Sequence, residues 1–289
     1  MDLCNIDEIK TVLLKNGFRF SKSLGQNFLT ASWVPERIAQ ECGANAKAVL
    51  EVGPGFGCLT AELAKRAEKV IAVELDRALL PVLRETVGEY ENLEIITGDI
   101  LKLDIKKICA EKAGSLPLVA CANLPYYITT PVLTALFESG VFETVTVMVQ
   151  KEVADRLTAE PGTKAYGSFT VYAEYHAEAE VLFDVSADCF MPKPKVSSAV
   201  VRFKMHDRPT AFISDKDMFF KVVRAAFSQR RKTLANSLSS AFSGSMGKER
   251  ILDIIQECGF RADIRGERLS LKEFANISNK MKDELIKIS

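Results

Sequence analysis

A glycine-rich loop gives the clearest chemical signal in the sequence. Residues 51–57 read EVGPGFG, directly after an apolar run typical of a strand and before a helical pattern. Glycines at such a place permit a tight turn and let a ligand approach backbone N–H groups at the start of a helix, and Gly53 and Gly55 are the candidate contacts. A dinucleotide-binding fingerprint counted from Gly53 needs a glycine at position 58, but Cys58 stands there. Taken alone, the loop is compatible with a nucleotide site or with a simple turn.

Two acidic residues at the ends of the following strands favour the nucleotide site. Glu74 ends the second predicted strand, 21 residues after Gly53, where a carboxylate can accept both ribose hydroxyls of an adenosine-containing cofactor. Asp99 ends the third predicted strand, where a carboxylate can accept a hydrogen bond from an adenine amino group. Open α/β sheets bind ligands at the carboxyl ends of their strands. The pattern resembles the S-adenosylmethionine methyltransferase fold, and this resemblance implies S-adenosylmethionine as the cofactor.

The fourth predicted strand is followed by Asn-Leu-Pro-Tyr, residues 123–126. A turn is one interpretation, because Asn and Pro favour turns. The tetrapeptide also resembles the [DNS]-P-P-[YFW] signature of enzymes that methylate planar amino groups on adenine, cytosine or glutamine. An amine conjugated to a purine is a poor nucleophile, since its lone pair is delocalised into the ring. The motif therefore points to a site that must change the geometry of such an amine.

Each residue of this motif has a part in that chemistry. If the Asn123 side-chain oxygen and the Leu124 backbone carbonyl accept the two N–H bonds, the nitrogen can pyramidalise and direct its lone pair at a methyl group. Tyr126 would stack on the base. The proton can leave after the transfer, when the nitrogen is cationic, so no strong general base is required.

Longer segments, taken together and in order along nearly the whole chain, resemble the ribosomal RNA adenine dimethyltransferase family. These segments are SLGQNFL (23–29), EVGPGFGCLT (51–60), VELD (73–76), NLPYYITTP (123–131), QKEVADRL (150–157), KAYGS (164–168), FMPKPKVSSAVV (190–201) and AFSQRRKTLANSL (226–238). The resemblance implies that Asn27 and Leu29 close over the cofactor beside Gly53, Glu74, Asp99 and Asn123. On local physics alone, residues 26–28 are equally compatible with a helix-cap region.

The same resemblance implies a substrate. Two adjacent adenines in a hairpin loop near the 3′ end of small-subunit rRNA would each become N6,N6-dimethyladenine, within an immature small ribosomal subunit. Phe190 matches the family position that packs on the face of the target base opposite Tyr126, and a buried loop anchor is the alternative. The target base must leave its stack to reach such a pocket.

Charge is distributed unevenly along the chain. The 289 residues include 38 basic and 38 acidic side chains, and this neutral average would normally count against a polyanion-binding protein. Residues 190–240, however, contain eleven Lys or Arg against three Asp, a charge of +8. The residues predicted to contact RNA phosphates are Lys193, Lys195, Arg224, Arg230, Arg231 and Lys232. Solvated helix faces are the other common explanation for such a run.

Three other functions remain open at this point. A related family methylates an adenine of large-subunit rRNA and confers macrolide resistance, and it shares the cofactor loop and the N-[LI]-P-[FY] motif. A ribosome assembly factor could keep the fold without needing methylation, although the intact acids and Asn123 argue against it. A nicotinamide dehydrogenase is disfavoured by Cys58.

Cysteine and histidine usage restricts the class of protein further. Seven cysteines, odd in number and without a C-x-x-C pair, indicate reduced thiols rather than disulfides or a zinc site. Only two histidines are present, so imidazole bases and His-rich metal centres are disfavoured. The first ten residues lack the apolar core of a signal peptide, and no stretch approaches the roughly 20 apolar residues of a membrane span. We expect a cytoplasmic monomer without a metal or a membrane anchor.

An alternation of short β-branched runs with longer amphipathic stretches must position these residues. The predicted strands are residues 48–52, 69–73, 93–97, 118–122, 144–149 and 199–204, and helical patterns cover 58–67, 77–87, 130–139 and 150–157. Residues 169–175 and 179–183 fit a strand or a helix. After Asp207, helices are expected at 218–227, 231–242, 248–257 and 271–287. We predict an α/β fold: a Rossmann-like methyltransferase sheet with helices on both faces (1–207) and a small all-helical RNA-binding domain (208–289).

Overall fold

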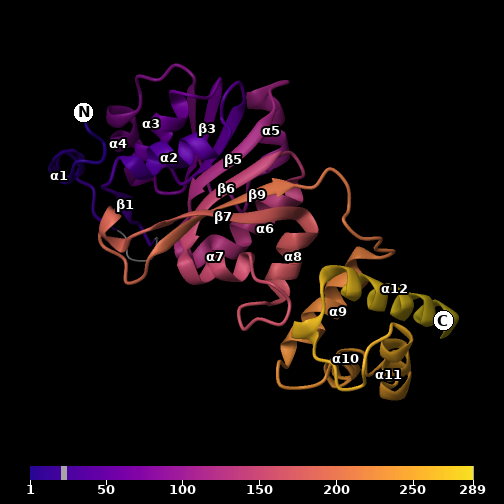
Figure 1. Cartoon of the computed structure of the whole chain (residues 1–289). Coiled ribbons are helices and arrows are strands. Elements are labelled where there is room, and N and C mark those ends of the chain that lie inside the picture. Colours follow the sequence, from indigo (N-terminus) through magenta and orange to yellow (C-terminus); the bar gives the residue numbers. More distant parts are fainter. Residues whose placement is uncertain (21–24, 289) are drawn as a thin grey trace. The chain divides into compact units, whose positions relative to one another are not determined.

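The computed structural model of the chain describes residues 1–20 and 25–288 (Figure 1). The chain divides into two compact units, of which the first consists of Met1–Ala154 and Ala179–Met205 and the second of Asp155–Glu178 and His206–Ser289. Each unit has its own buried core. The second of the two segments that form the second unit begins at His206, and the sequence placed the domain boundary after residue 207.

The second unit also contains Asp155–Glu178, which the sequence assigned to the first domain. Contacts between residues far apart in the chain explain the difference. The Tyr166 hydroxyl donates a hydrogen bond to the Leu269 carbonyl at 2.8 Å, and Tyr166 is completely buried in the core of this unit. Periodicity within a short segment carries no information about such a partner 103 residues away.

The first unit is built on a mixed sheet. Within the described residues its strands follow the order β4-β3-β2-β5-β6-β9-β7. The bounds are β2 (Ala48–Val52), β3 (Lys69–Glu74), β4 (Leu93–Thr97), β5 (Leu118–Asn123), β6 (Thr144–Gln150), β7 (Ala177–Val185) and β9 (Ser198–Met205). Strands β4, β3, β2, β5 and β6 are parallel, and β9 runs antiparallel to β6. Every residue of β2 is buried, as expected for a central parallel strand covered on both faces.

Helices cover both faces of this sheet, as predicted (Figure 1). From β2 the chain moves outward through β3 to β4, and it then returns to add β5 and β6 on the other side of β2. Because parallel crossovers are right-handed, the two directions place their helices on opposite faces. One face carries α2 (Trp33–Glu41), α3 (Cys58–Ala64) and α4 (Leu80–Thr86), and the other carries α5 (Ile105–Ala113) and α6 (Thr129–Ser139).

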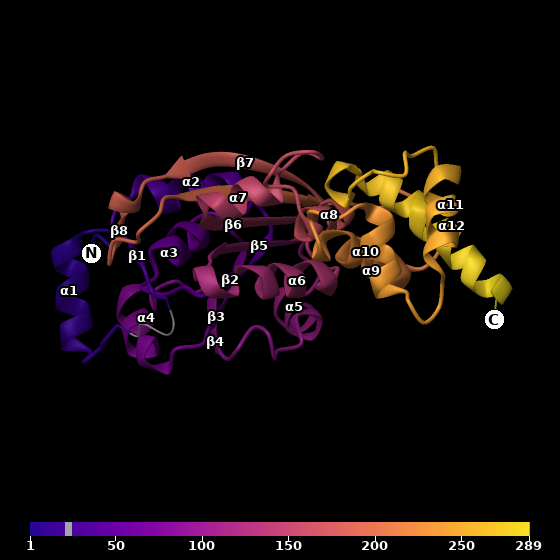
Figure 2. The same cartoon turned by 90° about the horizontal axis from the view of Figure 1, so that it is seen from below.

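A small second sheet joins two segments that are distant in sequence. Strand β1 (Phe28–Leu29) pairs antiparallel with β8 (Phe190–Met191), so that Leu29 lies opposite Phe190. Figure 2 shows this pair beside the N-terminal helix α1 (Ile6–Lys15). The pairing fixes the Q-N-F-L segment against the segment that carries Phe190.

The second unit is helical apart from the start of β7. Its helices are α8 (Ser168–His176), α9 (Lys216–Ser228), α10 (Leu234–Ala241), α11 (Lys248–Glu257) and α12 (Leu271–Ile288), and α7 (Lys151–Leu157) leads into it. The ambiguous stretch 169–175 is helix, whereas 179–183 is strand. The predicted helix 231–242 begins three residues later, because the Thr233 side chain caps it by accepting a hydrogen bond from the Asn236 N–H. None of the helices in residues 1–20 and 25–288 has the length and apolarity needed to cross a membrane.

Candidate active site

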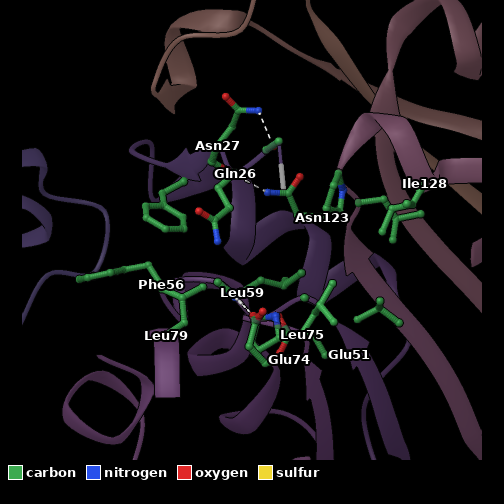
Figure 3. Close-up of a pocket in the computed structure, with 18 of the residues that line it drawn as sticks. Gln26, Asn27, Glu51, Phe56, Leu59, Glu74, Leu75, Leu79, Asn123 and Ile128 are labelled. Atoms are coloured by element: carbon green, nitrogen blue, oxygen red, sulfur yellow. Dashed lines mark hydrogen bonds between the residues drawn. The ribbon is translucent and has the colours of Figure 1, made fainter. Parts of the chain in front are cut away.

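A pocket opens at the carboxyl ends of β2, β3, β4 and β5, where the strand order reverses between β2 and β5. It encloses about 1040 Å³ of space not filled by atoms, including the solvent at its mouth. Figure 3 shows Gln26, Asn27 and Asn123 on one side of this space, with Glu51 and Glu74 on the opposite side. This reversal point is where open α/β sheets bind ligands.

The glycine loop forms the wall of the pocket between β2 and α3. Gly53 and Gly55 have φ angles of +70° and +60°, which favour glycine. A Cβ built on Gly53 would meet no atom within 4 Å, whereas one on Gly55 would contact the Phe28 ring at 3.4 Å. Gly57 has φ +96°, and its Cβ would lie 2.9 Å from Val87 Cγ1. The loop therefore combines an open approach at Gly53 with close packing at Gly57.

Glu74 occupies the end of β3, where the sequence placed it, and is buried in the pocket wall. Its Oε2 accepts a hydrogen bond from the Gly55 N–H at 3.2 Å, and its Oε1 accepts one from the Asp76 N–H at 2.8 Å. Burial raises the pKa of Glu74, against the opposing effect of these two backbone donors. The two bonds hold the carboxylate in place, and each oxygen keeps a lone pair for a further donor.

Asp99 follows β4 and lines the same pocket. Its Oδ1 accepts the Leu101 N–H at 3.1 Å, and its Oδ2 lies 3.6 Å from the exposed Lys102 ammonium. One oxygen is thus fixed by a backbone hydrogen bond, and the other lies beside an exposed ammonium group. A carboxylate oxygen has more than one lone pair, so Asp99 can still accept a hydrogen bond from a ligand amino group.

Glu51 is a pocket residue that was not among the predicted contacts. Only 1% of it is exposed, and its Oε2 has no hydrogen-bond partner in the described part of the chain. Burial, more than the neighbouring charge of Glu74, raises the pKa of Glu51 to about 8. One sequence signal could have identified Glu51 as a pocket residue: it is the single acid of β2 and lies two residues before Gly53.

The Q-N-F-L segment forms another wall of the pocket, and the ring of its Phe28 adjoins Gly55 of the glycine loop. Asn123 Nδ2 donates to the Asn27 carbonyl at 3.4 Å, and Asn27 Nδ2 donates to the Gly25 carbonyl at 3.1 Å. Gln26, which was also not predicted as a contact, donates from Nε2 to Asp76 Oδ2 at 2.8 Å. Leu29 is buried beside them and lines the pocket. Ser23 and Leu24 of the same sequence motif lie outside the described residues.

The four predicted catalytic residues all line this pocket. Asn123 ends β5; its Nδ2 donates to the Asn27 carbonyl, and its Oδ1 accepts no hydrogen bond from the described residues, so it can accept one from a ligand. Leu124 is held by its N–H, which donates to the Met148 carbonyl at 3.2 Å. The Tyr126 hydroxyl is bonded to Ser198 Oγ at 2.9 Å, and burial raises the pKa of Tyr126. Phe190 is only 5% exposed, so it serves as a core anchor as well as pocket wall.

The pocket fits S-adenosylmethionine by the chemistry of its donors and acceptors. The open approach at Gly53 admits a ligand to the backbone, and the carboxylates of Glu74 and Asp99 offer acceptors for hydroxyl and amino groups. The Oε2 of Glu51, which has no hydrogen-bond partner among the described residues, offers the ligand one further polar contact. Among the described residues, no cluster of three or more His, Cys, Asp or Glu forms a metal site.

The six basic residues predicted to bind RNA are not equivalent. Lys193 pairs with Asp188, whereas Lys195 has no ion pair within the described residues. In the second unit Arg224 is exposed on α9, and Arg231 and Lys232 are exposed in the turn before α10. Arg230 instead donates to the carbonyls of residues 164 and 166 at 2.9 and 3.3 Å and approaches Glu267 at 3.4 Å. Arg230 therefore stabilises the fold of the second unit, whereas the side chains of Arg231 and Lys232 make no such bond to the described residues.

A family model described as "Ribosomal RNA adenine dimethylase" matches residues 17–281 of this chain. The chain belongs to the ribosomal RNA adenine dimethylase family. It is therefore an S-adenosylmethionine-dependent adenine methyltransferase of ribosomal RNA. The nicotinamide dehydrogenase hypothesis was wrong, and the missing glycine at position 58 had already pointed that way.

Individual relatives agree with this family. A protein of Oceanobacillus iheyensis named "Ribosomal RNA small subunit methyltransferase A" is 45% identical over 274 residues, which cover 93% of each chain. A protein of the same name from Lachnoclostridium phytofermentans is 44% identical over 278 residues, covering 94% of this chain and 96% of the relative. Similarity at this level extends over both units of the chain.

Two solved structures share the fold. A dimethyladenosine transferase from Plasmodium falciparum superimposes with a TM-score of 0.75 at 24% identity, covering 89% of this chain and 98% of that one. The 23S rRNA methyltransferase ErmE gives a TM-score of 0.68 at 25% identity, covering 88% and 99%. The predicted fold class, a Rossmann-like methyltransferase sheet followed by helices, is confirmed.

Proposed function

We propose that this protein transfers methyl groups from S-adenosylmethionine to the N6 amino groups of two adjacent adenosines, in a hairpin loop near the 3′ end of small-subunit (16S) rRNA. Relatives at 44–45% identity carry the name of a small-subunit methyltransferase, and this name supports that substrate. The observation that carries the proposal is Asn123, whose Oδ1 accepts no hydrogen bond from the described residues and which lines a pocket that also contains Glu74 and Asp99.

In this proposal the cofactor is held by residues from three directions. Gly53 and Gly55 approach it from the loop after β2, Glu74 accepts the ribose hydroxyls, and Asp99 accepts from the adenine amino group. Asn27, Leu29 and Asn123 close the other side. The bound cofactor supplies an electrophilic methyl group on a sulfonium.

The catalytic residues act on the amine of the target adenine. Asn123 Oδ1 and the Leu124 carbonyl accept its two N–H bonds, which favours a pyramidal nitrogen with a directed lone pair. Tyr126, whose hydroxyl is anchored to Ser198, and Phe190 hold the base between their rings. Exclusion of water by these apolar walls strengthens the hydrogen bonds to the amine.

Recognition of the rRNA rests on basic side chains outside the pocket. We assign phosphate contacts to Lys193, Lys195, Arg224, Arg231 and Lys232, and a smaller contribution to Arg230 because its guanidinium is already bonded internally. The substrate in the cell is the immature small subunit, the protein acts as a monomer in the cytoplasm, and its chemistry uses no metal. A second, non-catalytic role in checking the assembly of the small subunit is compatible with binding to the immature subunit.

A large-subunit adenine methyltransferase is the second candidate, favoured by the similarity in fold to ErmE. The small-subunit assignment is preferred, because the relatives at 44–45% identity cover more than nine-tenths of the chain.

The replacement Asn123→Ala tests the assigned chemistry. The variant should lose methyl transfer to under-methylated small subunits while keeping the thermal stability of the wild type. Asn16→Ala is the matched control, since Asn16 lies outside the pocket and also donates its side-chain amide to a carbonyl, that of Val12. Wild-type turnover in the Asn123 variant would refute the proposed amine acceptor.

A further inference from the structure

Tyr127, the residue directly after the N-L-P-Y motif, is the most exposed aromatic side chain of the pocket lining. It is 55% exposed, whereas Leu124 is buried and Tyr126 is half-buried and bonded to Ser198. Tyr127 belongs to the 3-10 turn Tyr126–Ile128, between the catalytic motif and α6. Single exposed apolar residues are common on protein surfaces, so exposure alone assigns no role.

A second observation sets Tyr127 apart from an ordinary surface residue. A Cβ built on Gly25 would lie 3.4 Å from Tyr127 Cδ1 and 3.6 Å from Cε1, so the edge of the ring rests against the Gly25 backbone. Gly25 has φ +58° and precedes the segment that contains Asn27. The ring is thus supported from one side by the segment that faces the catalytic motif, while more than half of the residue stays open to solvent.

This placement has a consequence for RNA that rests on the proposed function. A base can reach Asn123 only after leaving its stack, so the nucleotide next to it loses a stacking partner. An exposed aromatic ring at the pocket mouth can replace that partner without reading the sequence, because every base has a stacking face. In the proposed substrate the neighbour of either target adenosine is itself a purine, which stacks well.

We propose that Tyr127 is the stacking platform for the nucleotide adjacent to the target adenosine. Tyr126 and Tyr127 then have separate tasks: the anchored ring contacts the base that reacts, and the exposed ring contacts its neighbour. Tyr127 is a positioning residue, because it touches neither the amine nor the methyl group. Its removal should weaken binding of the RNA and leave the chemical step unchanged.

The test compares steady-state methylation of under-methylated small subunits by the wild type, Y127A, Y127L and Y127W. We expect Y127A and Y127L to raise the KM for subunits about tenfold, with kcat, thermal stability and the Kd for S-adenosylmethionine unchanged. Y127W should keep the wild-type KM, because it retains an aromatic face. Leucine preserves much of the bulk against Gly25, so its failure to rescue separates stacking from packing.

Phe212→Ala is the matched control, since Phe212 is 80% exposed and does not line the pocket. A wild-type KM in Y127L, or a loss confined to kcat, would overturn the proposal for Tyr127. These results are distinguishable from failure of the proposed function, in which the wild-type protein itself would not methylate small subunits.

Discussion

Replacing Gly57 with alanine should destabilise the first unit without altering the pocket. A Cβ at this position would lie 2.9 Å from Val87 Cγ1 and 3.1 Å from Thr86 Oγ1. The left-handed backbone, with φ +96°, costs a non-glycine residue roughly 1–2 kcal/mol. The methyl group forced into packed surroundings costs roughly another 1–3 kcal/mol. We therefore expect a loss of about 3 kcal/mol, or roughly 6–12 °C in Tm for a unit of this size.

Gly53 provides the matched control for this prediction. Its φ of +70° carries a similar strain, but a Cβ there would meet no atom within 4 Å and would project into open space beside the pocket. The variant G53A should lose only about 1–2 kcal/mol of stability. It should also bind S-adenosylmethionine at least about tenfold more weakly, because its methyl group takes up space needed by the ligand.

Thermal unfolding and calorimetric titration with S-adenosylmethionine separate the two effects. G57A should be the less stable variant and should bind the cofactor normally below its Tm, whereas G53A should show the opposite pattern. If G53A bound the cofactor like the wild type, or if G57A were as stable as G53A, the assignment of an open approach at Gly53 and close packing at Gly57 would be refuted.

Two further predictions concern charged side chains. The double variant R231A/K232A should lower the slope of log Kd against log salt for an rRNA hairpin by about 1–2, because each phosphate contact contributes roughly 0.7–0.9 to that slope. The variant R230A should instead lower the Tm, because Arg230 bonds to two backbone carbonyls. An unchanged slope in the double variant would exclude phosphate contacts by Arg231 and Lys232. For Glu51, burial raises the pKa to about 8, so the folded state retains a proton that the unfolded state releases near pH 4.3. The wild type should therefore lose stability relative to E51Q as the pH rises from about 5 to about 8, measured as the difference in Tm, and parallel pH profiles would contradict this.

Much of the sheet and its ligand end could be predicted from the sequence. The strands 48–52 and 93–97 and the helix 248–257 have the expected bounds, because each is a continuous apolar or amphipathic run between turn residues. The sequence also predicts that four residues meet in one pocket: Gly53, Glu74, Asp99 and Asn123. Each lies at or just after the carboxyl end of a parallel strand, and parallel strands bring those ends to one edge.

Features that depend on contacts between distant residues could not be predicted in this way. The pairing of Leu29 with Phe190 involves two-residue strands, which are too short to show any periodicity. Asp155–Glu178 belong to the helical unit because of tertiary packing, such as the hydrogen bond from the Tyr166 hydroxyl to the Leu269 carbonyl. The internal use of Arg230 is likewise invisible in a run of three basic residues, because only the folded chain shows which guanidinium meets a carbonyl.

Two polar residues of the pocket, Gln26 and Glu51, were not among the predicted contacts. Glu51 stands inside the recognised glycine motif, but its burial, and the lack of a partner for its Oε2 among the described residues, become evident only once β2 is surrounded by other strands. Phe190 was predicted in the site, and the structure shows that it is also part of the hydrophobic core. Phe190 lies in β8, which pairs with β1, and both residues of β1 also line the pocket and belong to the core.

Methylation of small ribosomal subunits that lack the modification, followed by mapping of the modified nucleotides, tests the central claim most directly. The purified protein and S-adenosylmethionine should convert two adjacent adenosines near the 3′ end of the small-subunit rRNA to N6,N6-dimethyladenosine. Large-subunit rRNA should remain unmodified in the same assay. Equal activity on naked large-subunit rRNA, or no methyl transfer to small subunits, would contradict the account.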